Sequence, residues 1–240
     1  MGRLRKVYGL PMSAVAFVPA RGGSKRLPGK NRVELGGRTL VERAVNAALE
    51  SERFGRVVLS TDDDVIADRL RGREGVEVVA RPPEHSGDSA TVLGACLNFL
   101  EDSQSTDEWV GILLPTCPFR TAEHVRGGFD LLSEEVDAVI SVVEFDFPWE
   151  MALISEHGYG QPAVDPSPLI TGNTRSQDRR QVFHPNGAFY LGRVSSVLRD
   201  RTFFAGKMRL FEMNGTSSWD IDEPLDLEMA KWLVERGYER

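Results

Sequence analysis

Cysteine, histidine and long apolar runs are scarce in this sequence of 240 residues. Its two cysteines, Cys96 and Cys117, are too few for a disulfide framework, and their surroundings suggest a helix and a buried turn. A reducing, cytoplasmic location is therefore expected. No stretch of about 18 consecutive apolar residues is present. The sequence thus predicts no membrane span and no membrane partner.

Net positive charge is lacking as well. The formal net charge is −7 and the isoelectric point is near 5.3, which argues against a nucleic-acid binder whose affinity rests on a basic surface. With 41% hydrophobic residues, the chain can bury the core of one α/β domain, or of one domain with a sizeable excursion. Residues 1–12 carry charge but no apolar segment typical of a signal peptide, and are expected to form a flexible leader.

Against this acidic background, one loop carries only positive charge. The apolar run from Ala14 to Val18 is typical of a buried strand, and no acidic residue occurs between Arg21 and Arg32. Glycine-rich backbone and side-chain cations of this kind surround polyphosphates, so the loop predicts a nucleoside triphosphate site. A solvated basic surface loop is the alternative. The loop matches neither the P-loop pattern nor the GxGxxG dinucleotide pattern.

Strands and helices alternate with short connections along the first 143 residues. This rhythm predicts a Rossmann-like α/β fold, a mostly parallel sheet with helices on both faces. Ligands of such sheets lie beyond the carboxyl ends of the strands. Each polar loop of interest follows a predicted strand there: residues 19–31, 61–64, 81–91 and 115–120.

The alternation stops between Glu144 and Asn186, a stretch that contains five prolines. A segment this long without clear elements is uncommon inside a compact domain, so it is expected to pack on another subunit or to cover a substrate. Strands are predicted again at residues 187–191 and 208–213, and a helix at 224–236.

Five motifs in the same order resemble those of the sugar-acid cytidylyltransferases, typified by acylneuraminate (CMP-sialic acid) synthetases. The opening loop, ARGGSKRLPGKN, resembles the signature loop of that family. The others are RPPE followed by GDSAT, PTCPFR, HPNGAFY and WDIDEPLDL, which begin at residues 81, 87, 115, 184 and 219. The resemblance implies one cytidylyltransferase domain over residues 13–240, a dimerisation excursion at 145–185 and a homodimer.

The resemblance also implies a reaction, in which the anomeric hydroxyl of a 2-keto sugar acid attacks the α-phosphate of CTP and pyrophosphate leaves. Such transfers depend on charge stabilisation and in-line positioning. The implied catalytic residues are Arg21, Lys30 and Asp220. The implied CTP-binding residues are Arg21, Gly22, Gly23, Ser24, Lys25, Lys30, Asn31, Arg81, Asp88 and Ala90.

A magnesium site is predicted at Asp220 and Asp222. On an extended segment, residues two apart point the same way, and hard carboxylate oxygens suit Mg²⁺. Helix capping is an alternative for Asp222, because Pro224 follows closely. Asp226 is interpreted as first-turn dipole compensation. For Asp62 and Asp63, a helix cap is favoured over a metal-linked role.

The acceptor side departs from the family pattern at two positions. Leu114 stands where a glutamine is usual, and His184 stands where an arginine is usual. The implied acceptor is a sialic acid-like nonulosonate, with an eight-carbon ulosonate or a phosphonate as alternatives; a non-catalytic nucleotide-binding protein is a further alternative. The candidate acceptor residues are Leu114, Phe119, Arg120, Arg175, Gln177, His184, Asn186 and Phe203, with Arg175 as a natural carboxylate clamp.

Overall fold

The computed structural model describes residues 13–173, 175 and 180–238, so the predicted leader at 1–12 lies outside the described residues. The strands are β1 (Ala14–Pro19), β2 (Glu34–Leu35), β3 (Arg38–Thr39), β4 (Arg56–Thr61), β5 (Val76–Ala80), β6 (Trp109–Ile112), β7 (Ala138–Glu144), β8 (Leu153–Glu156), β9 (Tyr159–Pro162), β10 (Phe183–Arg193) and β11 (Met208–Glu212). The α-helices are α1 (Leu40–Ser51), α2 (Asp64–Leu70), α3 (Val92–Asp102), α4 (Ala122–Asp130), α5 (Pro168–Thr171), α6 (Val194–Asp200) and α7 (Pro224–Glu235). Short 3₁₀ turns occur at Lys30–Arg32, Pro83–His85 and Trp149–Met151.

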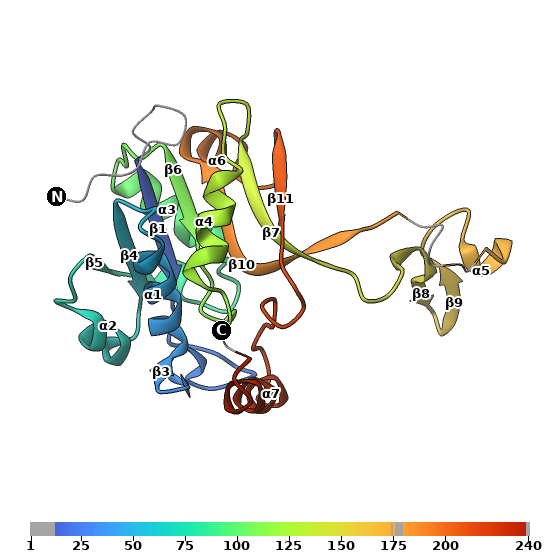
Figure 1. The fold of residues 1–240 in the computed structure, drawn as a ribbon, viewed down its shortest axis with the longest axis horizontal. Coiled ribbons are helices and arrows are strands. Elements are labelled where there is room, and N and C mark those ends of the chain that lie inside the picture. Colours follow the sequence, from blue (N-terminus) through green and yellow to red (C-terminus); the bar gives the residue numbers. More distant parts are fainter. Residues whose placement is uncertain (1–12, 174, 176–179, 239–240) are drawn as a thin grey trace.

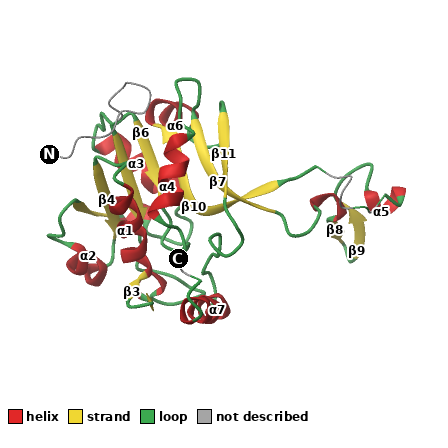
Figure 2. Cartoon of the chain, in the orientation of Figure 1, coloured by secondary structure: helices red, strands yellow, loops and turns green. Residues whose placement is uncertain are grey.

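The central sheet has seven strands in the order β11-β7-β10-β6-β1-β4-β5 (Figure 1). All neighbours pair in parallel except β10, which is antiparallel to both β6 and β7. Figure 2 shows helices in front of and behind this sheet. The predicted α/β fold with a mostly parallel sheet and helices on both faces is confirmed.

Each face of the sheet carries its own apolar core. Side chains of α1, α2 and α4 pack on one face, and those of α3 and α6 on the other. Strand β1 serves both cores, because Ala16 and Val18 point to the first and Phe17 to the second. A third, smaller core joins α7 to the turn after β6. The carboxyl ends of the parallel strands therefore lie on a rigid base.

Helix starts follow from local sequence. The Thr39 hydroxyl accepts a hydrogen bond from Glu42 N, and the Glu42 carboxylate accepts one from Thr39 N, which forms a capping box at the start of α1. Thr91 and Thr121 cap α3 and α4 through their hydroxyls. These caps fix where the loops at the carboxyl edge end.

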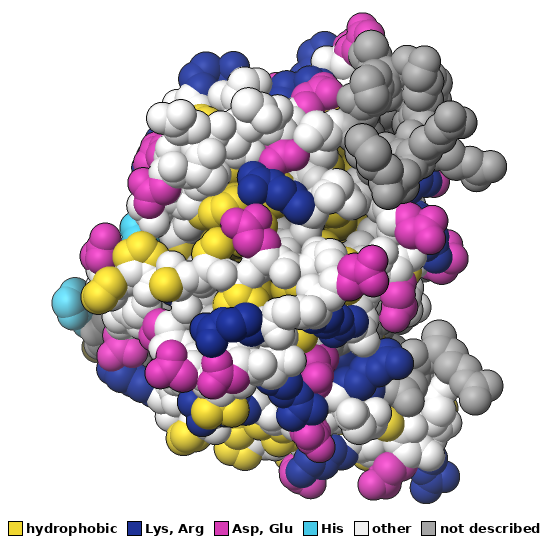
Figure 3. Space-filling view, turned by 90° about the vertical axis from the view of Figure 1, so that its left-hand side faces the viewer, with side chains coloured by type: hydrophobic (Ala, Val, Ile, Leu, Met, Phe, Trp, Pro, Cys, Tyr) yellow, Lys and Arg dark blue, Asp and Glu magenta, His cyan; other side chains and the backbone are white. Residues whose placement is uncertain are grey.

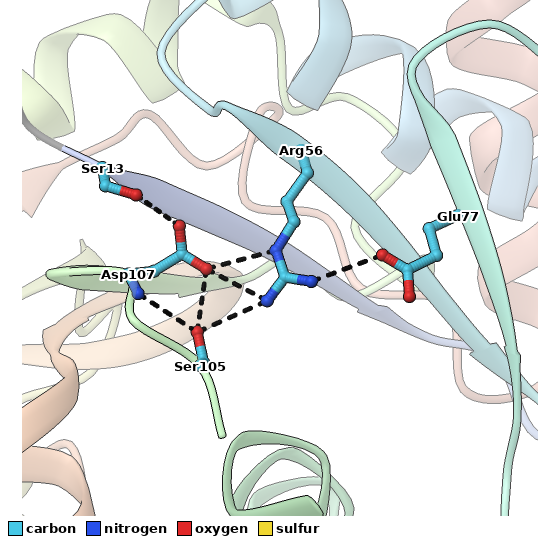
Figure 4. Close-up of polar contacts among 5 residues, drawn as sticks. All are labelled: Ser13, Arg56, Glu77, Ser105 and Asp107. Carbon is cyan, nitrogen blue, oxygen red and sulfur yellow. Dashed lines mark hydrogen bonds and ion pairs between the residues drawn. The ribbon is translucent and has the colours of Figure 1, made fainter. Parts of the chain in front are cut away.

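A polar cluster ties together the amino ends of four strands, at the edge opposite those loops (Figure 4). The Arg56 guanidinium, on β4, donates to Asp107 Oδ2 through Nε and Nη2, both at 3.1 Å. The other carboxylate oxygen of Asp107 accepts from the Ser13 hydroxyl at 2.5 Å, and Glu77 on β5 lies 3.4 Å from Arg56. A bidentate arginine–carboxylate pair holds a fixed geometry, so this cluster stabilises the strand order.

Residues after β7 leave the body of the molecule and return at β10 (Figure 1). This excursion holds the β8–β9 hairpin and α5. The hairpin was not predicted, because its side chains are exposed and do not alternate toward a core. The excursion follows β7 and ends where β10 begins at Phe183, two residues before the predicted end at 185; its dimerising role stays a prediction.

Basic and acidic side chains are interspersed on the face shown in Figure 3, so the described residues there form no continuous basic surface. Among the helices of the described residues, none is long and apolar enough to cross a membrane.

Candidate functional site

The carboxyl ends of β1, β4, β5 and β6 lie side by side, and the predicted polar loops extend from them. The backbone of the first loop is held by its neighbours. Gly22 N donates to Asp62 Oδ1 at 2.7 Å, and the Thr61 hydroxyl donates to the Ala20 carbonyl at 2.6 Å. Asn31 Nδ2 closes the loop on itself by donating to the Arg21 carbonyl at 2.9 Å. The glycine-rich loop is thus preshaped.

Asp63 caps α2, as favoured from the sequence. Its Oδ1 accepts from Val65 N at 3.0 Å and Ile66 N at 3.2 Å, while Oδ2 accepts from Arg32 Nε at 2.6 Å. Burial pushes its pKa up, but the Arg32 and backbone hydrogen bonds outweigh burial, so the pKa is lowered. Asp62 differs from the prediction, because its carboxylate binds the loop at Gly22 instead of the helix.

The cations of the loop meet acids from distant segments. Lys30 Nζ lies 2.9 Å from Asp222 Oδ1, and Arg26 lies 2.9 Å from Asp222 Oδ2. Lys25 pairs with Asp88 at 2.6 Å. Burial opposes ionisation of Asp222, yet Lys30 and Arg26 lower its pKa overall. The fold therefore joins the basic loop and the carboxylate pair, which lie far apart in sequence.

Capping does not explain Asp222. Glu223 occupies the N-cap position of α7, and Asp226 Oδ2 accepts from Asp222 N at 2.9 Å and from Glu223 N at 2.8 Å. The capping alternative for Asp222 is therefore wrong, and its carboxylate faces the loop. Asp226 lies in the first turn of α7, where it also completes the capping box.

Asp220 is the other member of the pair. Although Asp220 keeps an exposed surface, partial desolvation by surrounding protein raises its pKa and the charge of Asp222 adds to this, while a hydrogen bond from Thr116 and the charge of Lys30 oppose it. The Cys117 thiol lies 3.8 Å from Asp220 Oδ1. Across the described residues, no group of three or more histidine, cysteine or acidic side chains is placed to hold a metal.

The loop after β5 closes one side of the site. Arg81 is 6% exposed, and its Nε donates to the His85 carbonyl at 2.6 Å. Burial lowers its pKa, against the charge of Asp62. Arg21 Nη1 reaches the Gly87 carbonyl at 2.9 Å, and Ala90 N donates to the same carbonyl at 3.1 Å. Arg81 and Ala90, both predicted to bind CTP, thus lie in a loop that contacts the glycine-rich loop through Arg21.

Three predicted acceptor residues are buried in the interior instead of lining an open surface. Phe119 packs in the third core and Phe203 in the second, each 4% exposed. Arg120, also 4% exposed, donates from Nη1 to the carbonyls of Leu114 and Ala188, and burial lowers its pKa to about 10. Burial of these three side chains leaves them little open surface in this structure, and their contact with an acceptor stays a prediction.

Asn186 is also buried, since it is 6% exposed and both ends of its amide are bonded inside the chain; its contact with an acceptor stays a prediction. Leu114 is half-buried beside Gly187. His184 and Arg175 are exposed; His184 stacks edge-on against Phe145 where the excursion begins, and Arg175 lies within the excursion. These two are not brought to the loop of the same chain. Gln177 lies outside the described residues.

Sequence reasoning passed over Thr116, Cys117 and Tyr190, although each lies in a quoted motif. Burial raises the pKa of Tyr190 to about 12, and the charges of Cys117 and Asp220 contribute. The rings of Tyr190 and Phe204 meet edge to face with centroids 5.9 Å apart. Proximity to Asp220 is a tertiary property that no local spacing reveals.

Residues 15–146 match the family model described as Cytidylyltransferase. The chain belongs to the cytidylyltransferase family. This confirms the resemblance to sugar-acid cytidylyltransferases drawn from the motifs.

Relatives of this cytidylyltransferase include the N-acylneuraminate cytidylyltransferase of Streptococcus agalactiae, 33% identical over 88% of this chain and 51% of the relative. The chain thus spans about half the length of that relative. The CMP-N,N'-diacetyllegionaminic acid synthase of Legionella pneumophila is 29% identical over 95% of this chain and 99% of the relative. A CMP:2-keto-3-deoxy-manno-octonic acid synthetase complexed with CTP shares the fold, with a TM-score of 0.71, 16% identity and coverage of 94% of this chain and 99% of the other.

Proposed function

We propose that this protein transfers CMP from CTP to the anomeric hydroxyl of a 2-keto sugar acid and releases pyrophosphate. The observation that carries the proposal is the contact between Lys30 and Asp222 at 2.9 Å. It joins a basic, glycine-rich loop to a carboxylate pair at one edge of the sheet. Cations that can meet phosphates and carboxylates that can meet a metal ion, in one place, suit a metal–triphosphate complex.

On the donor side, the chain's own groups supply charge and position. Arg21, Lys25 and Lys30 neutralise the triphosphate, and Lys30 stands beside the α-phosphate, where negative charge develops. The anomeric oxygen forms a bond to the α-phosphorus as the bond to the bridging oxygen breaks, and the hydroxyl proton is released. The loop beside Arg81 and Ala90 receives the cytosine. Family membership supports this assignment.

Magnesium is the proposed cofactor, and the donor set fits it. Asp220 and Asp222 offer hard oxygens close to each other, since the charge of Asp222 helps to raise the pKa of Asp220. Mg²⁺ typically takes one or two carboxylates plus phosphates and water, and it needs no cage of three protein ligands. Bound there with CTP, the ion would neutralise charge on the phosphates.

The acceptor is proposed to be a nonulosonate of the sialic, legionaminic or pseudaminic kind. The names of the relatives support this class. Leu114 and His184 favour a member that lacks the polar groups read by glutamine and arginine, and an eight-carbon ulosonate or a phosphonate is the second candidate. A homodimer in the cytoplasm is proposed as well, with Arg175 offered by the excursion to the partner's acceptor.

The test is initial-rate pyrophosphate release with each of four nucleoside triphosphates and a panel of acids. We expect turnover with CTP and a nonulosonate only. In the same assay, Lys30→Ala should lose about 100-fold or more in kcat while its circular dichroism spectrum is unchanged. Turnover with UTP or GTP but not CTP would refute the nucleotide assignment. Wild-type rates for Lys30→Ala would show that Lys30 has no catalytic role.

A further inference from the structure

Strand β10 contains a bulge close to Asp220, because the Cys117 thiol contacts both the bulge and the Asp220 carboxylate. The strand pairs with β7 in one register through Pro185 and in a different register from Tyr190 onward. The backbone groups between them are lost to the ladder and need other partners. The Cys117 thiol donates to the Asn186 carbonyl at 3.0 Å, and Arg120 Nη1 donates to the Ala188 carbonyl at 2.7 Å. The turn after β6 is therefore fastened to the bulge.

Asn186 occupies the centre of this bulge. Its Oδ1 accepts from the Ser141 hydroxyl at 2.6 Å and from Ala188 N at 3.1 Å. Its Nδ2 donates to the Ser218 hydroxyl at 2.8 Å. An asparagine side chain can do both because its amide carries an acceptor oxygen and a donor NH₂ group on the same carbon. One buried side chain thus links β7, β10 and the loop that precedes α7.

The loop fastened in this way carries Asp220 two residues after Ser218. On its other side, Ile221 N donates to the Thr116 carbonyl at 2.9 Å, and Thr116 also bonds the Asp220 carboxylate. The segment from 218 to 221 is therefore held at both ends, by the Asn186 amide and by the turn after β6. Both anchors rest on the same bulge.

We propose that Asn186 and Ser218 are positioning residues, which aim the Asp220 carboxylate at the metal–CTP complex by fixing the loop that bears it. The inference rests on the proposed function for the identity of that ligand. Groups that orient ligating carboxylates typically change metal affinity or activity 10- to 100-fold when removed. The Asn186 side chain touches neither the loop cations nor an open surface, so it acts through Ser218.

Ser218→Ala is the sharper variant, because Ser218 is half-buried on a loop and the change removes one hydroxyl. Asn186 variants also strip partners from Ser141 and Ala188, which risks the fold. Ser217→Ala is a matched control: it is the adjacent serine, and within the described chain only its backbone N–H makes a hydrogen bond. Ser218→Thr keeps a hydroxyl and serves as the rescue.

The readout is Mn²⁺ binding in the presence of CTP, followed by electron paramagnetic resonance, together with kcat and the KM for CTP. We expect Ser218→Ala to bind Mn²⁺ about 10-fold more weakly. Its kcat should fall by a larger factor than its KM for CTP rises. Ser217→Ala should match the wild type, Ser218→Thr should recover most of the binding, and Asp220→Asn should be at least as weak as Ser218→Ala.

Wild-type Mn²⁺ binding in Ser218→Ala would overturn the inference, as would an equal loss in Ser217→Ala. Loss of the folded state in Ser218→Ala would assign the pair a structural role and overturn it too. Failure of the proposed function is distinguishable: wild-type protein would release no pyrophosphate with any acid, while the Mn²⁺ differences among these variants would persist.

Discussion

Individual side chains shape this site mainly through hydrogen bonds and ion pairs with one another and with the loop backbone. Asp62, Asp63 and Asn31 keep the glycine-rich loop in place, and Lys30 and Arg26 converge on Asp222. Residue type predicted which groups carry charge. It did not predict that Arg120 binds two carbonyls inside the protein, because burial depends on what packs above a residue.

Asp63 gives a prediction on stability and pH. Asp63→Ala should lower the free energy of unfolding at pH 7 by about 2 kcal/mol, since it removes a helix cap and the partner of Arg32. Asp63→Asn should lower the free energy of unfolding less than Asp63→Ala does. Its amide oxygen still caps α2, and the lost ion pair with the half-exposed Arg32 is screened by solvent. Urea denaturation measures both.

The pH dependence follows from the lowered pKa of Asp63. Its ionised form stabilises the fold fully above the unfolded-state pKa of about 3.9, and this contribution disappears as the pH falls through the lower folded-state value. The difference in unfolding free energy between wild type and Asp63→Asn should therefore be constant near neutral pH and should shrink toward zero at acidic pH. A gap that widens as the pH falls would contradict this assignment.

At the level of elements, the pattern of apolar residues located the strands and helices of the central sheet well. The direction of β10 and the bulge within it could not be predicted. A strand's own sequence reports that it is buried, but its neighbours decide its direction. The bulge depends on side chains that replace the missing backbone hydrogen bonds of the sheet: Ser141 accepts one, and Cys117 and Arg120 each donate one.

Gly187 lies within this bulge and has a backbone conformation that favours glycine. Its φ is +75°, and a Cβ there would lie 3.1 Å from Leu114 Cδ1 and 3.2 Å from Cys117 Sγ. Gly187→Ala should therefore cost about 1–3 kcal/mol of unfolding free energy in urea titrations. Gly72→Ala is the control, with φ +81° and no neighbour within 4 Å, and it should cost less. Equal losses would mean that crowding at the bulge contributes nothing.

For the whole molecule, the excursion stands apart from the body (Figure 1). It also exposes large apolar side chains. Tyr159 is 81% exposed and Ile170 is 77% exposed. Apolar surface of this kind on a projecting segment marks a protein–protein contact. It supports the proposed homodimer.

Light scattering after size exclusion should therefore give about twice the chain mass of 26.7 kDa. Ile170→Asp should shift the protein toward monomer. Leu225→Asp, at a site on α7 that is 71% exposed, should leave the mass unchanged. A wild-type monomer at every concentration, or dissociation by Leu225→Asp alone, would refute a dimer through the excursion.

By itself, the sequence determined the α/β class, the basic loop after the first strand, the carboxylate pair and the family, because these depend on local periodicity and contiguous motifs. Tertiary structure alone decided which motif residues face the site. Lys30 and Asp222 meet because parallel strands end at one edge, whereas Phe119, Arg120, Asn186 and Phe203 turn inward because neighbouring helices and strands cover them. Burial and long-range contact are properties of packing, and no local pattern contains them.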